Sequence, residues 1–172
     1  MTIAPTLQKY MDERGLRYDL VPHEPTLSAL GSAHAGHISG DRLAKGVVLR
    51  DGVSYRLAVL PASHHLQLTD LKTELGQDIH LASELQVAEV FRNYERGAVP
   101  AVGPCYGLDV IIDTSIDQQP ELYFEAGGHA TLVHVNGGRV RTAQSAGPTR
   151  LLQRPRLMAR DSAFGHEGGH PV

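Results

Sequence analysis

Apolar side chains recur at helical spacing in four short stretches of the chain, which predicts helices at residues 6–14, 26–35, 69–76 and 83–91. A glycine stands at the end of each of the first three: Gly15, Gly36 and Gly76. Thr69 is the expected cap of the third helix. Ser83 and Gln86 have the spacing of a capping box, so the fourth helix is expected to begin there.

Between these helices, alternating or continuously apolar runs predict short strands at residues 16–21, 44–60 as a hairpin, 79–81, 110–112, 122–124 and 132–135. Asn136 and Gly137 predict a further hairpin turn, which leads into residues 139–142. The glycines and prolines of residues 93–107 predict a loop. Short strands and hairpins interrupted by helices favour one α/β domain around a mixed, curved sheet. We place this domain at residues 1–153 and a polar C-terminal tail at residues 154–172.

One predicted strand contains a lysine. Residues 43–49 form an apolar run around Lys45, and Asp51-Gly52 then signals a hairpin turn. With Asp51-Gly52 as a two-residue loop, one face of the hairpin holds the pairs Lys45–Ala58, Val47–Arg56 and Leu49–Ser54. The other face holds Ala44–Val59, Gly46–Leu57 and Val48–Tyr55, and is predicted to be core.

Lys45 therefore lies on a mixed face, opposite a small alanine and near Arg56. A cation beside small residues on a walled sheet face can hold an anion or polarise a carbonyl group. The same position also suits a lysine whose stem packs on the sheet and whose head lies in water. The pattern leaves both interpretations open.

Composition excludes several classes of protein. The 172 residues fit one domain, and a net charge of -3 argues against extended nucleic-acid binding, although contact with one end of an RNA is allowed. A single cysteine, Cys105, excludes an internal disulfide framework and fits a reducing compartment. Neither a signal peptide nor an apolar run of membrane length is apparent, so we expect a cytoplasmic protein.

The sequence offers weak candidates for metal binding and for a nucleophile. His166-Glu167-Gly168-Gly169-His170 has the letters of a zinc-protease motif, but its two glycines and the following Pro171 disfavour the helix that the motif needs. His34 and His37 straddle a glycine, and His64 and His65 are adjacent, so neither pair suits one metal ion. Cys105 lies in a loop without an evident base. We therefore expect no metal and no cofactor.

The run Glu125-Ala126-Gly127-Gly128-His129 follows a predicted strand. Its glycines would let a ligand approach the backbone, and backbone N–H groups there could support an oxyanion. A plain β turn without a binding role is the alternative interpretation of this sequence.

Several of these pieces follow one another in a fixed order across residues 5–142. In chain order they are His23-Glu24-Pro25-Thr26, the lysine strand, Leu60-Pro61-Ala62, the glycine loop at residues 97–103, Ile111-Ile112-Asp113, and Tyr123-Phe124-Glu125-Ala126-Gly127-Gly128. In this order and spacing they resemble the YbaK/prolyl-tRNA-synthetase-associated domain family of aminoacyl-tRNA deacylases. The loop departs from the family's usual Gly-Gly-x-Ser-Pro-x-Gly at Ala98 and at Pro100-Ala101, around the amino-acid pocket.

The resemblance implies a barrel-like sheet with surrounding helices and a metal-independent deacylase. Lys45 would be the catalytic residue, holding the terminal phosphate or the ester carbonyl group. The family is thought to use the substrate's own ribose hydroxyl in place of a side-chain base. The substrate-binding residues that the resemblance implies are His23, Thr26, Gly97, Gly103, Ala126, Gly127, Gly128 and His129.

The implied function is trans-editing by a freestanding enzyme, which hydrolyses the ester of a mischarged aminoacyl-tRNA that carries a small amino acid. The implied partner is the acceptor end of the aminoacyl-tRNA, with an aminoacyl-tRNA synthetase as a further candidate and neither membrane nor DNA. The alternative is a non-catalytic module of the same fold that binds a tRNA end or a small ligand. A metal-dependent hydrolase fits least.

Overall fold

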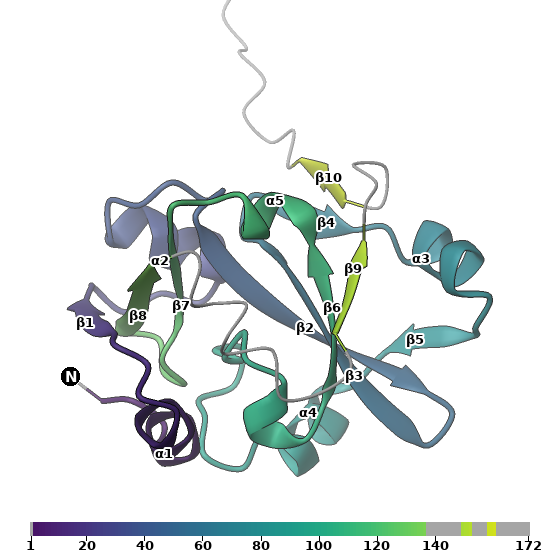
Figure 1. Ribbon diagram of the computed structural model, residues 1–172, viewed down its shortest axis with the longest axis horizontal. Helices are drawn as coiled ribbons and strands as arrows, with labels where there is room; N and C mark the ends of the chain where they lie inside the picture. The colour runs from purple at the N-terminus through teal and green to yellow at the C-terminus, as the bar shows by residue number, and fades with distance from the viewer. Residues whose placement is uncertain (1, 137–148, 153–157, 161–172) are drawn as a thin grey trace, which may run out of the picture.

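The computed structural model describes residues 2–136, 149–152 and 158–160 as one α/β domain (Figure 1). The main sheet has the strand order β1-β8-β7-β2-β3-β6-β9, and β5 pairs with the far end of β2. Its strands are β1 Asp19–Pro22, β2 Leu43–Asp51, β3 Ser54–Pro61, β5 Ile79–Leu81, β6 Asp109–Asp113, β7 Glu121–Glu125, β8 Thr131–Asn136 and β9 Thr149–Leu152.

The sheet is mixed, as predicted, because β2–β7, β3–β6 and β6–β9 are parallel pairs and the other pairs are antiparallel. Among the described strands the path begins at β1 and ends at β9, so the sheet is open, whereas a barrel would close on itself. The predicted fold class is confirmed, with an open sheet in place of the barrel-like one.

Five α-helices and one 3-10 helix accompany the described strands: α1 Pro5–Glu13, α2 Ala29–Ala35, α3 Leu68–Leu75, α4 Glu84–Val90, α5 Thr114–Asp117 and η1 Pro104–Tyr106. The predicted capping box at Ser83 is confirmed. The prediction that Thr69 caps α3 is wrong, because the helix already begins at Leu68 and places Thr69 within its first turn. The helix expected from residue 26 begins at Ala29, since the Ser28 side chain caps it by accepting from the Gly31 N–H.

The hairpin of β2 and β3 forms, but the predicted register is wrong by two residues. Asp51 pairs with Ser54, so the two-residue loop is Gly52-Val53, and Lys45 lies opposite Leu60 instead of Ala58. Gly52 takes a left-handed φ of 58°, which a glycine adopts at little cost. An even shift keeps every side chain on its predicted face.

Both faces of the hairpin are covered. On what we call the first face, Ala44, Val48, Leu57 and Val59 are buried in a cluster with residues of α1 and α4, as predicted. On the second face, Leu49, Ala58 and Leu60 pack with residues of α3 and β5, while Leu43 packs with residues of α2 and β8. Lys45 belongs to the second face, between these two clusters.

The pattern of the sequence missed several elements. The strand β4 His64–Leu66 pairs with β10 Met158–Arg160, which falls within the predicted tail, and β9 pairs with β6. The short helices α5 and η1 were also not predicted. The hairpin turn expected at Asn136-Gly137 and the strand at 139–142 lie outside the described residues.

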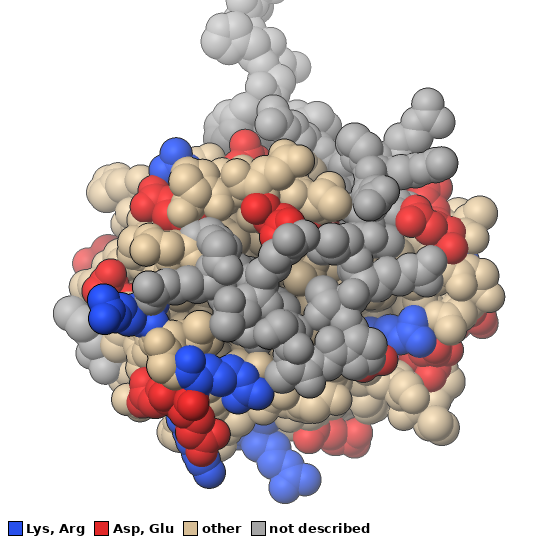
Figure 2. Space-filling model, viewed as in Figure 1, with Lys and Arg blue, Asp and Glu red and all other residues tan. Residues whose placement is uncertain are grey.

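Acidic and basic side chains are interspersed on one face of the molecule. Figure 2 shows Lys and Arg next to Asp and Glu over this face of the molecule, and no broad basic area is visible on its described part. Among the described residues, no helix has both the length and the apolar character that crossing a membrane requires.

Candidate active site

Lys45 lies in the part of β2 that runs beside β7. The parallel register pairs Leu43 with Tyr123 and Ala44 with Phe124. Continuing along both strands, the next residues are Lys45 and Glu125, so their side chains emerge on the second face of neighbouring strands. Lys45 is half-buried, and its Nζ donates to the Ala62 carbonyl oxygen at 3.3 Å. The cation is thus held at the sheet surface with a carboxyl group nearby.

Glu125 is the buried acid of this region, with only 3% of its surface exposed. Its Oε1 accepts a hydrogen bond from the Ser32 hydroxyl at 2.6 Å, and Ser32 in turn bonds Thr26 Oγ1 at 2.6 Å. Ser32 gives its one proton to Glu125, which leaves its oxygen as an acceptor, and the Thr26 hydroxyl lies within reach of both Ser32 Oγ and Ser28 O, the latter at 3.3 Å. This chain of three side chains fixes α2 to the end of β7 and places predicted residue Thr26 one step from the carboxyl group.

Burial raises the pKa of Glu125 above its ordinary value of 4.5, because removal from water disfavours the charged form. The Ser32 hydrogen bond and the charges of His23 and His129 act in the opposite direction, while Glu95 adds to the rise. Both predicted histidines therefore lie close enough to Glu125 to affect its ionisation.

His23 and His129 are brought together by backbone hydrogen bonds. The His23 N–H donates to Ala130 O at 3.0 Å, and the Thr26 N–H donates to His129 O at 3.2 Å. Each imidazole also contacts a backbone carbonyl oxygen: His23 Nδ1 lies 2.8 Å from Glu24 O, and His129 Nε2 lies 2.6 Å from Arg96 O. These predicted site residues are more than a hundred positions apart in the sequence, and they lie side by side in the structure.

The turn between β7 and β8 is clamped by Glu95, which was not predicted. The Glu95 N–H donates to Gly127 O at 2.7 Å, and its Oε2 accepts from the His129 N–H at 3.0 Å. A Cβ atom added at Gly128 would lie 3.2 Å from Glu95 Oε1. Gly128 therefore leaves room for this clamp.

Ala126 and Gly127 face the start of α1. Ala126 is fully buried, and its carbonyl oxygen accepts from the Ala4 N–H at 2.7 Å. Gly127 has a φ of 102°, and a Cβ atom there would lie 2.6 Å from Ala4 Cβ. The two residues therefore connect the turn to the start of α1.

The loop at residues 97–103 divides between two environments. Gly97 has a φ of 90°, and a Cβ atom there would lie 3.4 Å from His129 Cε1, so the loop begins beside the site. Gly103 lies against β6, where a Cβ atom would overlap Val110 Cγ2. Between them, Val99 and the Pro100 carbonyl oxygen cover Gly46 on the first face of β2, the opposite face from Lys45.

Other candidate chemistry is limited. Among residues 2–136, 149–152 and 158–160, no group of three or more His, Cys, Asp or Glu is arranged to hold a metal ion, and the motif at 166–170 lies outside these ranges. Cys105 Sγ contacts Val102 O at 3.1 Å, and burial raises the pKa of its thiol to about 12. A thiol with that pKa is a poor nucleophile near neutral pH.

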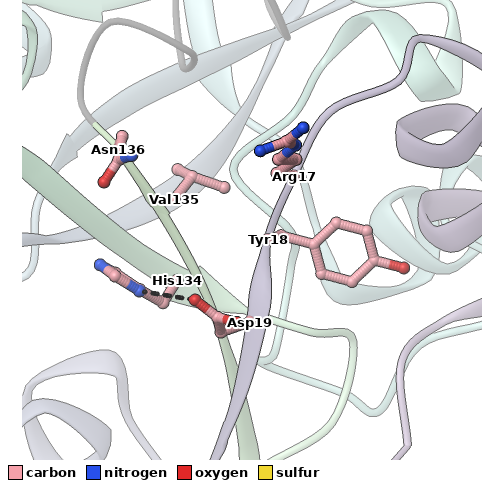
Figure 3. Close-up of a pocket in the computed structure, with 6 residues that line it drawn as sticks. All are labelled: Arg17, Tyr18, Asp19, His134, Val135 and Asn136. Atoms are coloured by element: carbon pink, nitrogen blue, oxygen red, sulfur yellow. Dashed lines mark ion pairs between the residues drawn. The ribbon is translucent and has the colours of Figure 1, made fainter.

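A separate pocket of about 280 Å³ lies at the β1–β8 edge (Figure 3), lined by Arg17, Tyr18, Asp19, His134, Val135 and Asn136. His134 lies between two carboxylates, 3.5 Å from Asp19 and 3.2 Å from Glu121, and stacks on Tyr123. None of the predicted site residues lines this pocket.

Comparison with known proteins gives a family and a fold. The family model described as the aminoacyl-tRNA editing domain matches residues 23–143, which include all nine predicted site residues. No curated protein matches the sequence.

Two crystal structures are similar over most of their length. The hypothetical protein APE2540 superposes with a TM-score of 0.71 at 21% identity, covering 84% of this chain and 97% of that one. "A putative trans-editing enzyme for prolyl tRNA synthetase" superposes with a TM-score of 0.69 at 19% identity, covering 87% and 98%. At these identities, the two structures establish the fold alone.

Proposed function

This chain belongs to the aminoacyl-tRNA editing domain family, and from that premise we propose that it acts in trans as a deacylase on mischarged aminoacyl-tRNA that carries a small amino acid. The observation that carries the proposal is the position of Lys45: a half-buried cation on the face of the sheet that also holds Glu125, inside the matched residues. The acceptor end of the tRNA is the proposed partner, and a synthetase is a further candidate.

The proposed reaction is hydrolysis of the ester between the amino acid and the terminal ribose. Lys45 would hold the terminal phosphate or the ester carbonyl group, where its positive charge stabilises negative charge as it develops. The substrate's free ribose hydroxyl would orient the attacking water and relay a proton: it would accept the water proton while giving its own proton to the leaving ribose oxygen, which releases the free amino acid. Backbone groups at Gly97 and at the 126–129 turn would position the ester, and positioning alone lowers barriers by several kcal/mol.

The proposed preference for small amino acids rests on the position of Gly97 beside His129. A Cβ atom at Gly97 would lie in ordinary van der Waals contact with this ring, at 3.4 Å, so the space between the loop and the ring is about one methyl group wide. Ala126 and Gly127 face α1, so they would act on substrate size only through the position of the turn. A hydrophobic pocket separates neighbours that differ by one methylene by only about 1–3 kcal/mol, so some cross-activity is expected.

The test is a deacylation assay of the purified protein on a panel of aminoacyl-tRNAs. Alanyl, seryl, threonyl and cysteinyl esters on mismatched tRNA should be hydrolysed faster than aromatic esters. Saturable binding of the tRNA end without turnover of any ester would support the non-catalytic module instead. Preferred hydrolysis of an aromatic ester would contradict the small-substrate proposal.

A further inference from the structure

Three buried polar atoms around Glu125 have no hydrogen-bond partner in the described protein: His23 Nε2, Glu125 Oε2 and His129 Nδ1. Unsatisfied buried polar atoms are unfavourable and uncommon. The only other side-chain atom of this kind among the described residues is the Tyr106 hydroxyl, so three of the four belong to one site. Such a concentration indicates a place where a ligand's polar group completes the bonding.

All three atoms are hydrogen-bond acceptors. A carbonyl oxygen only accepts, so the contact with Glu24 O requires a proton on His23 Nδ1 and leaves Nε2 of the neutral ring with a lone pair. By the same reasoning, the contact with Arg96 O requires a proton on His129 Nε2 and leaves Nδ1 with a lone pair. The third acceptor is the carboxyl oxygen of Glu125 that Ser32 does not bond.

The three acceptors belong to segments that hydrogen bonds hold together. Backbone hydrogen bonds join the His23 and Thr26 segment to residues 129 and 130, and Thr26 is linked through Ser32 to the Glu125 carboxyl group, which lies deeper than either ring. No atom of the three bonds another, and the described residues contain no cluster arranged for a metal ion. Acceptors that are not arranged for a metal ion suit a cation that brings its own hydrogen atoms.

We propose that His23, Glu125 and His129 bind the α-ammonium group of the aminoacyl ester. The inference rests on the proposed deacylase function and adds the recognition of one substrate group to it. An ammonium group has three N–H donors, one for each acceptor, and its positive charge pairs with the carboxylate. The site then distinguishes a free amino acid ester from one whose nitrogen is acylated, as in a peptidyl ester.

This role also explains the Ser32 hydrogen bond. Oε1 of Glu125 is held by Ser32, which Thr26 holds in turn, so Oε2 is the oxygen that remains for a ligand. Burial raises the pKa of the carboxyl group, and a bound ammonium group favours its ionised form. Glu125 would thus be a substrate-binding residue, and Ser32 and Thr26 positioning residues.

Binding of a non-hydrolysable analogue tests the inference independently of turnover. The probes are 3′-alanylamido-3′-deoxyadenosine, its N-acetyl form and its N-trimethyl form, each titrated calorimetrically into the full chain. The free amine should bind at least about tenfold more tightly than the N-acetyl form. The N-trimethyl form, which keeps the charge but lacks the N–H donors, should bind about as weakly as the N-acetyl form.

Glu125→Gln should bind the free and N-acetyl forms within about twofold of each other, whereas Glu121→Gln, on the same strand, should retain the preference of the unmodified protein. Equal binding of the two forms by the unmodified protein, tight binding of the N-trimethyl form, or no binding of the free amine would each overturn the inference, even if the protein hydrolyses esters. The expected preference in a protein without deacylase activity would leave the ammonium site standing and remove the proposed function.

Discussion

At the scale of single residues, the hydrogen-bond partners of a side chain decide what it can do. The sequence left open whether the head of Lys45 lies in water. In the structure Lys45 is half-buried, and its Nζ bonds the carbonyl oxygen of buried Ala62. A cation held in this way is already positioned when a phosphate or an ester arrives, which favours the functional interpretation.

Lys45→Ala should lower the deacylation rate by one to three decades, or about 1.4–4 kcal/mol of barrier, because the positioned charge is lost. The measurement is single-turnover hydrolysis of a small aminoacyl-tRNA. Lys9→Ala is the matched control, since Lys9 is an exposed lysine of α1 that forms an ion pair with the exposed Glu13. Near-native turnover by Lys45→Ala in a folded protein would remove the centre of the proposed mechanism.

Glu125 should make stability depend on pH. A carboxyl group whose pKa is raised by folding stabilises the native state below its ordinary pKa of 4.5, and this contribution is lost as pH rises through the raised value. The glutamine side chain that replaces Glu125 is uncharged at every pH. The melting temperature of Glu125→Gln relative to the unmodified protein should therefore rise from pH 4.5 upward. A difference in melting temperature that does not change with pH would show that burial does not raise the pKa of Glu125.

At the scale of elements, the β7–β8 turn and the loop before residue 103 form one unit. Glu95 holds the turn through the Gly127 carbonyl oxygen and the His129 N–H, while Ala4 holds it from the other side through Ala126 O. The turn is therefore fixed between α1 and the loop. Substitutions there are expected to change stability before they change substrate choice.

Gly127→Ala should destabilise the fold by about 1–3 kcal/mol, because alanine is strained at a φ of 102° and its Cβ would overlap Ala4. Denaturant unfolding measures the loss. Gly52→Ala is the matched control: Gly52 also has a positive φ, but a Cβ atom there meets nothing within 4 Å. A loss no greater than that of the control would argue against the close approach of α1.

At the scale of the whole molecule, the net charge is -3, and the face drawn in Figure 2 mixes acidic and basic groups on its described part. Such a surface suits the proposed contact, which is limited to the end of a tRNA. The cluster around Glu125 lies between β1, α2, β7 and β8, so four elements have to assemble before the site exists.

Hydrolysis should survive prolonged treatment with a chelator, because the described residues hold no cluster with the arrangement of a metal site and the sequence of residues 166–171, with two glycines and a proline, disfavours the helix that a zinc motif needs. The assay is the same deacylation before and after chelation, with the metal content of the protein measured in parallel. Stoichiometric zinc whose removal abolishes activity and whose return restores it would overturn this expectation.

Local signals made much of the fold predictable. The capping box at Ser83, the glycine at the end of α3, the apolar runs of β5 to β8 and the lysine within β2 each depend on a few neighbouring residues, so the sequence alone determined them. The order of its motifs likewise indicated the family, which the match over residues 23–143 shows.

Tertiary structure decided the features that depend on contacts between residues far apart in the sequence. The hairpin register was fixed by which residues met across the strands, and β10 became a strand by pairing with β4. Ser32 and Glu125 are 93 residues apart, and nothing local to either predicts their bond. Two glycines of one loop, Gly97 and Gly103, also face different neighbours. Propensity and periodicity act over a few residues, whereas burial and partnership are properties of the assembled molecule.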